Sequence, residues 1–389
     1  MNFYAGICFL TLVSPLIMPT RTLIILLTLL LTIAQMPAAE VRDPRGSKAA
    51  DVLEYAPLLL PWAVKAAGGE TRSGWGRMAV SQGMGAVFTV GIVEGLKRTV
   101  HEPRPDGSDN RAFPSGHAAI AFMGATMIER ELGWRSPWYT LGAYTFATGI
   151  AMERVIDRRH RPVDVITGAG IGILATHLGY IVGDAIFGSN LPAHTRLRVT
   201  TDRLNIPFVS LETAMLIPMY RLQAGSARIR PELALSAGLK GGVPLSDNWG
   251  VHMLLALQSM PIYIDSGTRH TYAAPLNAIG IEAGPTYSLP LSNVIELTAE
   301  LSGGYYKNFN LRTVDKSIRP GSGTGVGRLT VGAQWRLTDR MAVGAHFGYQ
   351  LSHSSFSVVP STAYAITETA TASTTSGSLL INISTKVSF

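Results

Sequence analysis

Three short segments of the sequence combine two histidines, one carboxylate and three fixed cations with a serine and a glycine. These residues are Lys97, Arg104, Ser115, Gly116, His117, Arg154, His160 and Asp164. Fixed cations can neutralise a phosphate and its transition state, one histidine can attack phosphorus, and a second can protonate the leaving oxygen. The residue types therefore point to phosphoryl transfer without a metal.

The order and internal spacing of these segments resemble the signature of the type 2 phosphatidic acid phosphatase superfamily. Six residues separate Lys97 from Arg104, and the run Pro-Ser-Gly-His follows, ending at His117. In the third segment, five residues separate the arginine from His160, and three more precede Asp164. The family includes lipid phosphate phosphatases, bacterial non-specific acid phosphatases and vanadium haloperoxidases.

The resemblance covers residues 41–188 and departs from the family at one position. Family members usually carry serine before the arginine of the third segment, whereas this chain carries Glu153. A carboxylate there can repel the substrate phosphate or pair with Arg154. We expect Glu153 to tune activity rather than to support it.

The resemblance implies a role for each matched residue. His160 would be the nucleophile that becomes a phosphohistidine, and Asp164 would hold its ring and stabilise its charge. His117 would be the general acid for the leaving alcohol and then the base that activates water. A cradle for the phosphate would be formed by Lys97, Arg104, Ser115, Gly116 and Arg154. No metal or other cofactor is implied.

Other polar residues have simpler interpretations. Four that flank the segments either bind lipid headgroups or are solvated, and the sequence leaves both open: His101, Arg158, Arg159 and Arg161. We predict that His177 lies in a helical core. His252 and His346 fall on the polar faces of expected strands and need no chemical role.

Composition favours an exported chain that contacts a membrane. The 389 residues carry a net charge of +7, only 15% are charged, and the mean hydropathy is +0.21. The positive charge suits anionic lipid headgroups, and no dense run of Lys and Arg indicates nucleic acid. The single Cys8 lies in a predicted leader, so a mature chain would have neither cysteine catalysis nor a thiolate metal site.

We predict a secretory signal peptide over residues 1–39. Arg21 precedes the apolar stretch 22–33, and small residues follow it, as in export signals. Met18 is a possible alternative start. An uncleaved membrane anchor is the other interpretation, and the shortness of the apolar stretch argues against it.

From residue 51 to 187, apolar residues recur at helical spacing. The expected helices cover 51–67, 74–100, 117–132, 137–153 and 162–187. The segment 101–114, rich in Pro, Asp, Gly and Asn, is predicted to be irregular and exposed. It places Arg104 near a helix N-terminus, where backbone N–H groups favour anions.

The glycines of the last expected helix, and the charged residues of two expected helices, each need interpretation. Gly168, Gly170 and Gly172 echo a dinucleotide-binding loop, but no strand precedes them, so we predict close helix packing instead. The helices 74–100 and 162–187 carry charged residues. We therefore expect them to belong to a compact domain rather than to span a membrane.

After a polar linker at 189–207, the hydrophobic period becomes two, so each strand has one apolar and one polar face. Eight strands are expected, at 208–221, 228–245, 249–264, 275–290, 293–306, 325–337, 341–352 and 377–389. Tight turns follow strands two, four and six, and longer loops follow three, five and seven, as in outer-membrane barrels. The terminal Phe389 resembles the end of such proteins. A soluble sandwich or lipocalin-like cup is the alternative.

The sequence thus predicts two parts, an all-α phosphatase domain at 40–188 and an antiparallel, eight-stranded transmembrane β-barrel at 208–389. The domain would lie in the periplasm of a Gram-negative bacterium, and the barrel assembly machinery would insert the barrel into the outer membrane. The favoured substrate is lipid A phosphate, followed by undecaprenyl diphosphate and phosphatidylglycerol phosphate. Alternatives are a broad-specificity acid phosphatase, a vanadium-dependent haloperoxidase and a non-catalytic barrel that binds anionic lipid.

Overall fold

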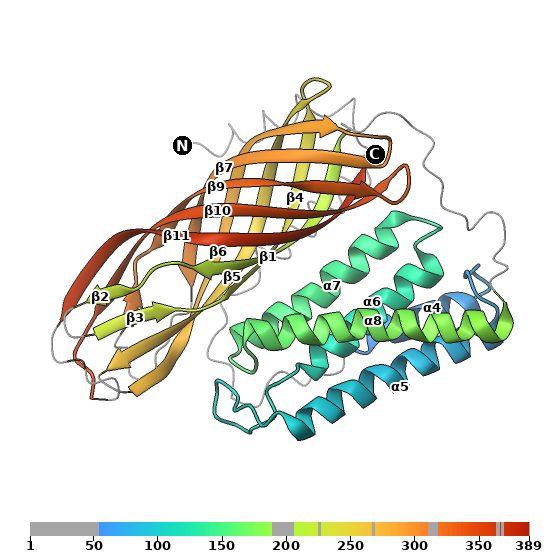
Figure 1. Ribbon diagram of the computed structural model, residues 1–389, viewed down its shortest axis with the longest axis horizontal. Helices are drawn as coiled ribbons and strands as arrows, with labels where there is room; N and C mark the ends of the chain where they lie inside the picture. The colour runs from blue at the N-terminus through green and yellow to red at the C-terminus, as the bar shows by residue number, and fades with distance from the viewer. Residues whose placement is uncertain are drawn as a thin grey trace. The chain divides into compact units, whose positions relative to one another are not determined.

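The computed structural model describes residues 54–188, 206–224, 227–266, 269–309, 318–362, 366 and 369–388. In this part of the chain, five helices precede a closed antiparallel barrel (Figure 1). The predicted leader, most of the linker and Phe389 lie outside the described residues. The helical segment and the barrel are described separately below.

The five helices follow the predicted ranges closely. They are α4 (Ala56–Ala66), α5 (Trp75–Thr99), α6 (Gly116–Leu132), α7 (Pro137–Ile156) and α8 (Pro162–Phe187). Local sequence explains where they begin: the Ser115 and Ser136 hydroxyls accept backbone N–H groups at the N-termini of α6 and α7, and proline opens α7 and α8. Helix α4 begins five residues later than expected, and the other four begin within one residue of the predicted position.

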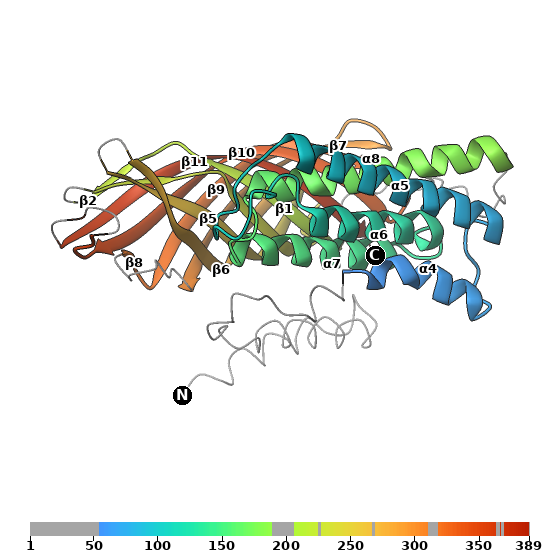
Figure 2. The ribbon, with the colours of Figure 1, turned by 90° about the horizontal axis from the view of Figure 1, so that it is seen from below.

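Small residues let α8 pack against α5 and α6 (Figure 2). A Cβ on Gly168 would collide with the carbonyl oxygen of Ser115, and one on Gly172 with that of Ala119, both on the α6 side. Gly170 faces open space. The prediction of helix packing is therefore confirmed for two of the three glycines.

Helices α5 and α8 are long and apolar enough to cross a membrane by length and composition. Their charged residues therefore do not exclude a span by composition, and the expectation that these helices belong to a compact domain stays a prediction. The charges lie toward the helix ends, where α5 carries Arg77 and Lys97 and α8 carries Asp164 and Asp184. An 18-residue window with few charges therefore lies between them in each helix.

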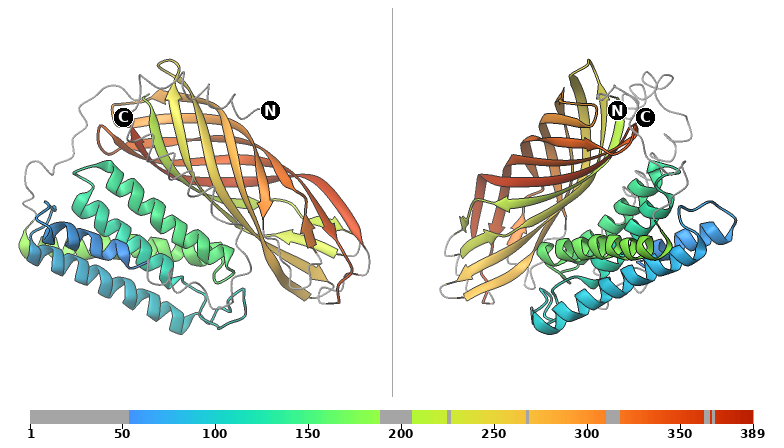
Figure 3. Two further views of the ribbon diagram at one scale, coloured as in Figure 1. Left: turned by 180° about the vertical axis from the view of Figure 1, so that it is seen from behind. Right: turned by 45° about the vertical axis from the view of Figure 1, so that its right-hand side comes forward.

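Eight strands form the barrel wall. They are β1 (Phe208–Pro218), β4 (Ala234–Pro244), β5 (Trp249–Ser266), β6 (Arg269–Pro290), β7 (Ile295–Phe309), β9 (Gly323–Arg336), β10 (Met341–Val358) and β11 (Ala370–Ser388). The last strand pairs with the first, with Phe208 opposite Ser388, which closes the wall (Figure 3). Three short strands, β2 (Leu222–Ala224), β3 (Ala227–Pro231) and β8 (Ile318–Pro320), extend the barrel at the end away from Phe208 and Ser388.

The tight turns at 245–248, 291–294 and 337–340 confirm the predicted short-turn end. The opposite end differs from the prediction. The expected second strand is divided into β3 and β4, β6 begins at Arg269, and β10 and β11 pair as far as Val358 and Ala370. The long loops predicted after strands three and seven are therefore much shorter. Serine, threonine and alanine hide the alternation there, whereas the backbone ladder continues.

The outward face of the barrel is apolar and the inward face is polar. On β9, Leu329 and Val331 are exposed, whereas Arg328 and Thr330 between them are buried. The same alternation places Phe347 outside and His346 inside on β10. Because a soluble barrel would turn its polar face outward, this arrangement is that of a membrane barrel, and the soluble alternative is excluded.

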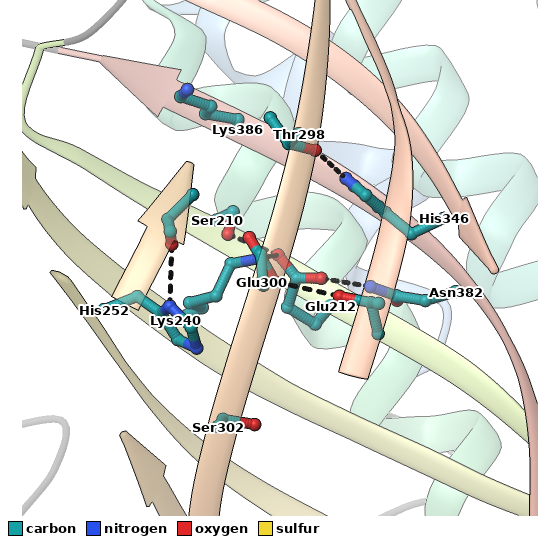
Figure 4. A network of polar contacts seen from close by, with 12 residues as sticks. Ser210, Glu212, Lys240, His252, Thr298, Glu300, Ser302, His346, Asn382 and Lys386 are labelled. Atoms are coloured by element: carbon teal, nitrogen blue, oxygen red, sulfur yellow. Dashed lines mark hydrogen bonds and ion pairs between the residues drawn. The ribbon is translucent and has the colours of Figure 1, made fainter. Parts of the chain in front are cut away.

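Side chains fill the lumen. Toward the short-turn end, Lys240 Nζ lies 3.0 Å from Glu212 Oε1 and 2.8 Å from Glu300 Oε1, and Asn382 donates to Glu212 (Figure 4). A second pair joins Arg328 to Glu282 at 2.9 Å. Toward the other end the interior is apolar, formed by buried side chains that include Leu216, Met260, Ile262, Phe356 and Leu380.

Candidate active site

Four helix ends bring the three sequence segments together. Lys97 lies in the last turn of α5 and Arg154 in the last turn of α7, whereas Ser115 caps α6 and Asp164 lies in the first turn of α8. Backbone hydrogen bonds join these ends: Ser115 N donates to Asp164 O at 3.0 Å, and His160 N donates to Arg154 O at 3.1 Å. All the predicted site segments therefore meet.

The imidazole of His160 is held by a backbone carbonyl. Its Nδ1 lies 2.7 Å from the oxygen of Ala112, so Nδ1 carries the proton and donates it. Asp164 Oδ2 lies 3.8 Å from the same nitrogen and accepts the backbone N–H of Arg161 at 2.8 Å. The Ala112 carbonyl thus accepts the hydrogen bond that fixes the ring, and the Asp164 carboxylate lies beside the same nitrogen.

The other nitrogen of His160, Nε2, is buried and has no hydrogen-bond partner among the described residues. Burial lowers the pKa of His160, and the charge of Arg104 lowers it further, although Asp164 and the Ala112 carbonyl oppose the shift. The ring is therefore held neutral, with Nδ1 protonated and the lone pair on Nε2. A neutral imidazole with an unpartnered nitrogen is a nucleophile.

Among the three cations expected to bind the phosphate, Lys97 is less buried than Arg154 and more buried than Arg104. Its ammonium donates to the carbonyl of Arg111 at 2.8 Å. Burial lowers the pKa of Lys97, and the neighbouring Arg104 and Arg111 lower it further. A Cβ on Gly116 would lie 3.9 Å from Lys97 Cε, so the ammonium arm runs beside the N-terminus of α6, where free N–H groups favour an anion.

The two cradle arginines each pair with a carboxylate. Arg104 Nε lies 2.8 Å from Asp109 Oδ1, and Arg154 donates to Glu153 Oε2 from Nη2 at 2.8 Å and from Nε at 3.2 Å. The Asp109 and Glu153 side chains remain 43% and 25% exposed. Burial would raise the pKa of Asp109, but the Arg111 amide and the Arg104 guanidinium lower it below its usual range. Both arginines thus already hold anionic oxygens.

Further ion pairs fix the irregular segment 101–114, whose predicted lack of regular structure is confirmed. Arg159 Nε lies 3.4 Å from Asp106 Oδ2, and Arg161 Nη2 lies 2.6 Å from Glu102 Oε1. These two arginines connect the segment to the residues around His160. Of the other flanking residues, His101 is exposed and Arg158 is half-buried.

His117 follows Gly116 at the start of α6 and lies beside a carboxylate that the sequence analysis missed. Its Nε2 is 3.7 Å from Glu54 Oε2, and the Glu54 side chain is only 4% exposed. No motif marks Glu54 in the sequence. Its one signal is that it is a lone charge in an otherwise apolar stretch.

Three other described histidines, His177, His252 and His346, lie in other parts of the helices and strands. His177 on α8 is half-buried, not in the core as predicted, and burial followed by the charge of Arg130 lowers its pKa. His252 and His346 face the lumen, where each contacts a threonine hydroxyl. Among the described residues, no group of three His, Cys, Asp or Glu side chains is placed to hold a metal ion.

Comparisons with known proteins identify a family for part of the helical segment. Residues 79–186 match the PAP2 superfamily. The chain is 27% identical over 342 residues to the lipid A 1-phosphatase of Porphyromonas gingivalis, covering 81% of this chain and 73% of that protein.

Two solved structures resemble separate parts of the chain. OprG, an outer membrane protein of Pseudomonas aeruginosa, has a TM-score of 0.38 at 13% identity and covers 46% of this chain and 95% of its own. LpxE of Aquifex aeolicus has a TM-score of 0.28 at 21% identity, with coverages of 36% and 87%. The match to the family model makes residues 79–186 a PAP2 superfamily domain, and the strand pairing shows that a closed eight-stranded antiparallel β-barrel follows it.

Proposed function

We propose that this protein is a phosphatase that removes phosphate from a lipid through a phosphohistidine at His160. The observation that carries the proposal is the buried imidazole of His160, whose Nδ1 donates to the Ala112 carbonyl and whose Nε2 has no hydrogen-bond partner among the described residues. The PAP2 domain and the relative named lipid A 1-phosphatase support the reaction class. They also make lipid A phosphate the first substrate to test.

In the first step, the lone pair of His160 Nε2 attacks phosphorus and the bond from phosphorus to the ester oxygen breaks. The electron pair of that bond goes to the leaving oxygen, which takes a proton from the imidazolium of His117. The products are the lipid alcohol and phosphohistidine. Positive charge then develops on the His160 ring, and the Asp164 carboxylate 3.8 Å away stabilises it.

In the second step, neutral His117 accepts a proton from water as the water oxygen attacks phosphorus. The bond from phosphorus to Nε2 breaks, which returns the lone pair to His160 and releases inorganic phosphate. Lys97, Arg104 and Arg154 would neutralise the non-bridging oxygens in both transition states. In this proposal the phosphate takes the place of Asp109 and Glu153 on the two arginines.

We further propose that the barrel lies in the outer membrane of a Gram-negative bacterium and that the helical domain, about residues 40–188, lies in the periplasm. The apolar outer face of the barrel supports insertion into a membrane. The described ends of the barrel, Phe208 and Ser388, lie opposite each other at the short-turn end. In outer-membrane barrels the short turns face the periplasm, which would put the preceding domain there.

The test is an assay of the purified full chain in detergent with lipid A, undecaprenyl diphosphate and phosphatidylglycerol phosphate, in which released phosphate is measured. Quenching during turnover should trap an acid-labile, base-stable phosphoryl group on His160. Lipid A should be dephosphorylated fastest. Absence of phosphate release from every lipid and from a simple aryl phosphate would overturn the phosphatase proposal.

The proposed location of the protein in the outer membrane needs a separate measurement. Separation of bacterial membranes should place the protein in the outer membrane, with heat-modifiable migration on gels because folded barrels resist detergent. Recovery in the inner membrane, with protease-sensitive sites on the cytoplasmic side, would contradict the proposed location while leaving the chemistry untouched.

A further inference from the structure

We propose that Glu54 is a positioning residue that keeps His117 protonated and oriented for proton donation to the leaving oxygen. This inference rests on the proposed phosphatase function. Glu54 lies before α4 and outside residues 79–186, which match the PAP2 superfamily. It therefore adds a carboxylate to the site from a part of the chain that the family match does not include.

Helix packing brings Glu54 to His117. Gly124 lies seven residues after His117, so both are on one face of α6. A Cβ on Gly124 would lie 2.8 Å from Pro57 Cβ and 3.2 Å from the backbone nitrogen of Leu58. This close approach holds the start of α4 on the same face of α6, and Glu54, three residues before Pro57, reaches His117 at 3.7 Å.

The burial of Glu54 strengthens its electrostatic interaction with His117. Its side chain is 4% exposed, so solvent screens its interaction with the imidazole weakly. An opposite charge at this distance favours the imidazolium form of His117. Among the described residues, the other charged or titratable groups of the site are Lys97 from α5, Arg104 from the segment 101–114, Arg154 from α7, His160 just before α8 and Asp164 in its first turn. The three cations disfavour the imidazolium, and Glu54 opposes them.

The two histidines of the site each have a buried carboxylate nearby, but they differ in burial and in hydrogen bonding. The His160 side chain is 1% exposed and donates Nδ1–H to an uncharged carbonyl, with Asp164 3.8 Å away, whereas the His117 side chain is 29% exposed and has Glu54 3.7 Å away. Environments that separate two titratable groups in this way assign the acid and the base. During the reaction the proton passes from the His117 imidazolium to the leaving oxygen. Glu54 stays ionised and forms no bond.

The experiment compares two substrates that differ in their need for a general acid. An alkyl phosphate has a poor leaving group that requires protonation, whereas p-nitrophenyl phosphate leaves without it. Glu54→Gln should lower kcat about 10- to 100-fold on the alkyl phosphate, which is less than the usual full contribution of a general acid because His117 itself remains. On the aryl phosphate it should change kcat by less than about threefold. The ratio of the two rates does not depend on how much of a preparation is folded.

The pH dependence gives a second readout. A general acid must be protonated, so kcat falls as pH rises through the titration of His117. Loss of the carboxylate should move this alkaline limb to lower pH in Glu54→Gln, and Glu54→Asp should restore part of the shift. Glu94→Gln, which removes a carboxylate paired with Arg111, is the control and should leave both readouts unchanged.

Two outcomes separate this inference from the proposed function. If the wild-type protein releases phosphate but Glu54→Gln loses activity equally on both substrates with an unmoved alkaline limb, the role of Glu54 is overturned. If the wild-type protein releases no phosphate from either substrate, the phosphatase proposal itself has failed.

Discussion

The helical site and the barrel lumen both hold buried charges, but they neutralise them differently. In the lumen, Lys240 lies between Glu212 and Glu300, and all three side chains are at most 10% exposed. In the site, Arg104 and Arg154 pair with carboxylates that keep one side open to solvent. Both members of each lumen ion pair are shielded from solvent, whereas the carboxylates of the site ion pairs remain partly exposed.

This difference distinguishes charged residues that stabilise the fold from charged residues that are able to bind a ligand. A buried pair that lacks solvent access cannot exchange its partner, and removal of one member leaves the other unpaired in a low dielectric. A guanidinium whose carboxylate faces solvent can replace it with a phosphate, which offers more oxygens and more charge. The same residue types thus stabilise the fold in one region and, in the proposed mechanism, bind the substrate phosphate in the other.

The largest effect is expected from the nucleophile. His160→Ala should reduce phosphate release by more than about 100-fold, because no phosphoenzyme can form, and should leave the heat-modifiable migration of the barrel unchanged. Retention of more than about a hundredth of the wild-type rate would contradict the covalent mechanism.

A substitution in the barrel lumen should destabilise the barrel without altering the candidate active site. Lys240→Met leaves Glu212 and Glu300 buried without their cation and should cost about 3–5 kcal/mol of barrel stability. Denaturant unfolding, followed by loss of heat-modifiable migration, measures this cost. Arg340→Met, in an exposed turn, is the control. Equal midpoints for the two variants would show that the lumen pairs do not stabilise the barrel.

A smaller change is expected at Glu153, which pairs with Arg154. Glu153→Ser should leave activity equal or higher and tighten inhibition by phosphate or vanadate by up to about fivefold, the usual size of a partly exposed ion pair. Inhibition constants for the variant and the wild type provide the measurement. A loss as large as that of His117→Ala would make Glu153 a catalytic group.

The pH profile sharpens the comparison further. His160 must be neutral to attack, and because burial lowers its pKa, protonation removes the nucleophile only below the ordinary histidine range near 6.5. The acidic limb of kcat/KM should therefore lie below pH ~6.5. An acidic limb above that value would mean that the ring is not held neutral in the free enzyme.

The smallest expected effect is that of a chelator. EDTA should leave phosphate release unchanged, since the proposed cradle consists of fixed cations. Loss of activity that a divalent ion restores would indicate a metal-dependent reaction instead.

Local sequence signals were sufficient to predict most of the helices and strands. Helix ranges followed from apolar spacing and from caps such as Ser115 and Pro162, since these signals act within a few residues. Barrel strands followed from alternation wherever one face met an apolar environment. The alternation failed near Val358 and Ala370, where serine, threonine and alanine occupy both faces but backbone hydrogen bonds still pair the strands.

The sequence by itself determined which chemical groups are available, because motif spacing fixes His117, His160 and Asp164 at the ends of predictable helices. Tertiary structure decided their partners. A backbone carbonyl at Ala112 has no sequence signature, so its contact with His160 could not be foreseen. Glu54 reaches His117 only because Gly124 admits α4. Which face of the barrel points inward was likewise decided by closure of β11 on β1, since alternation alone allows either face.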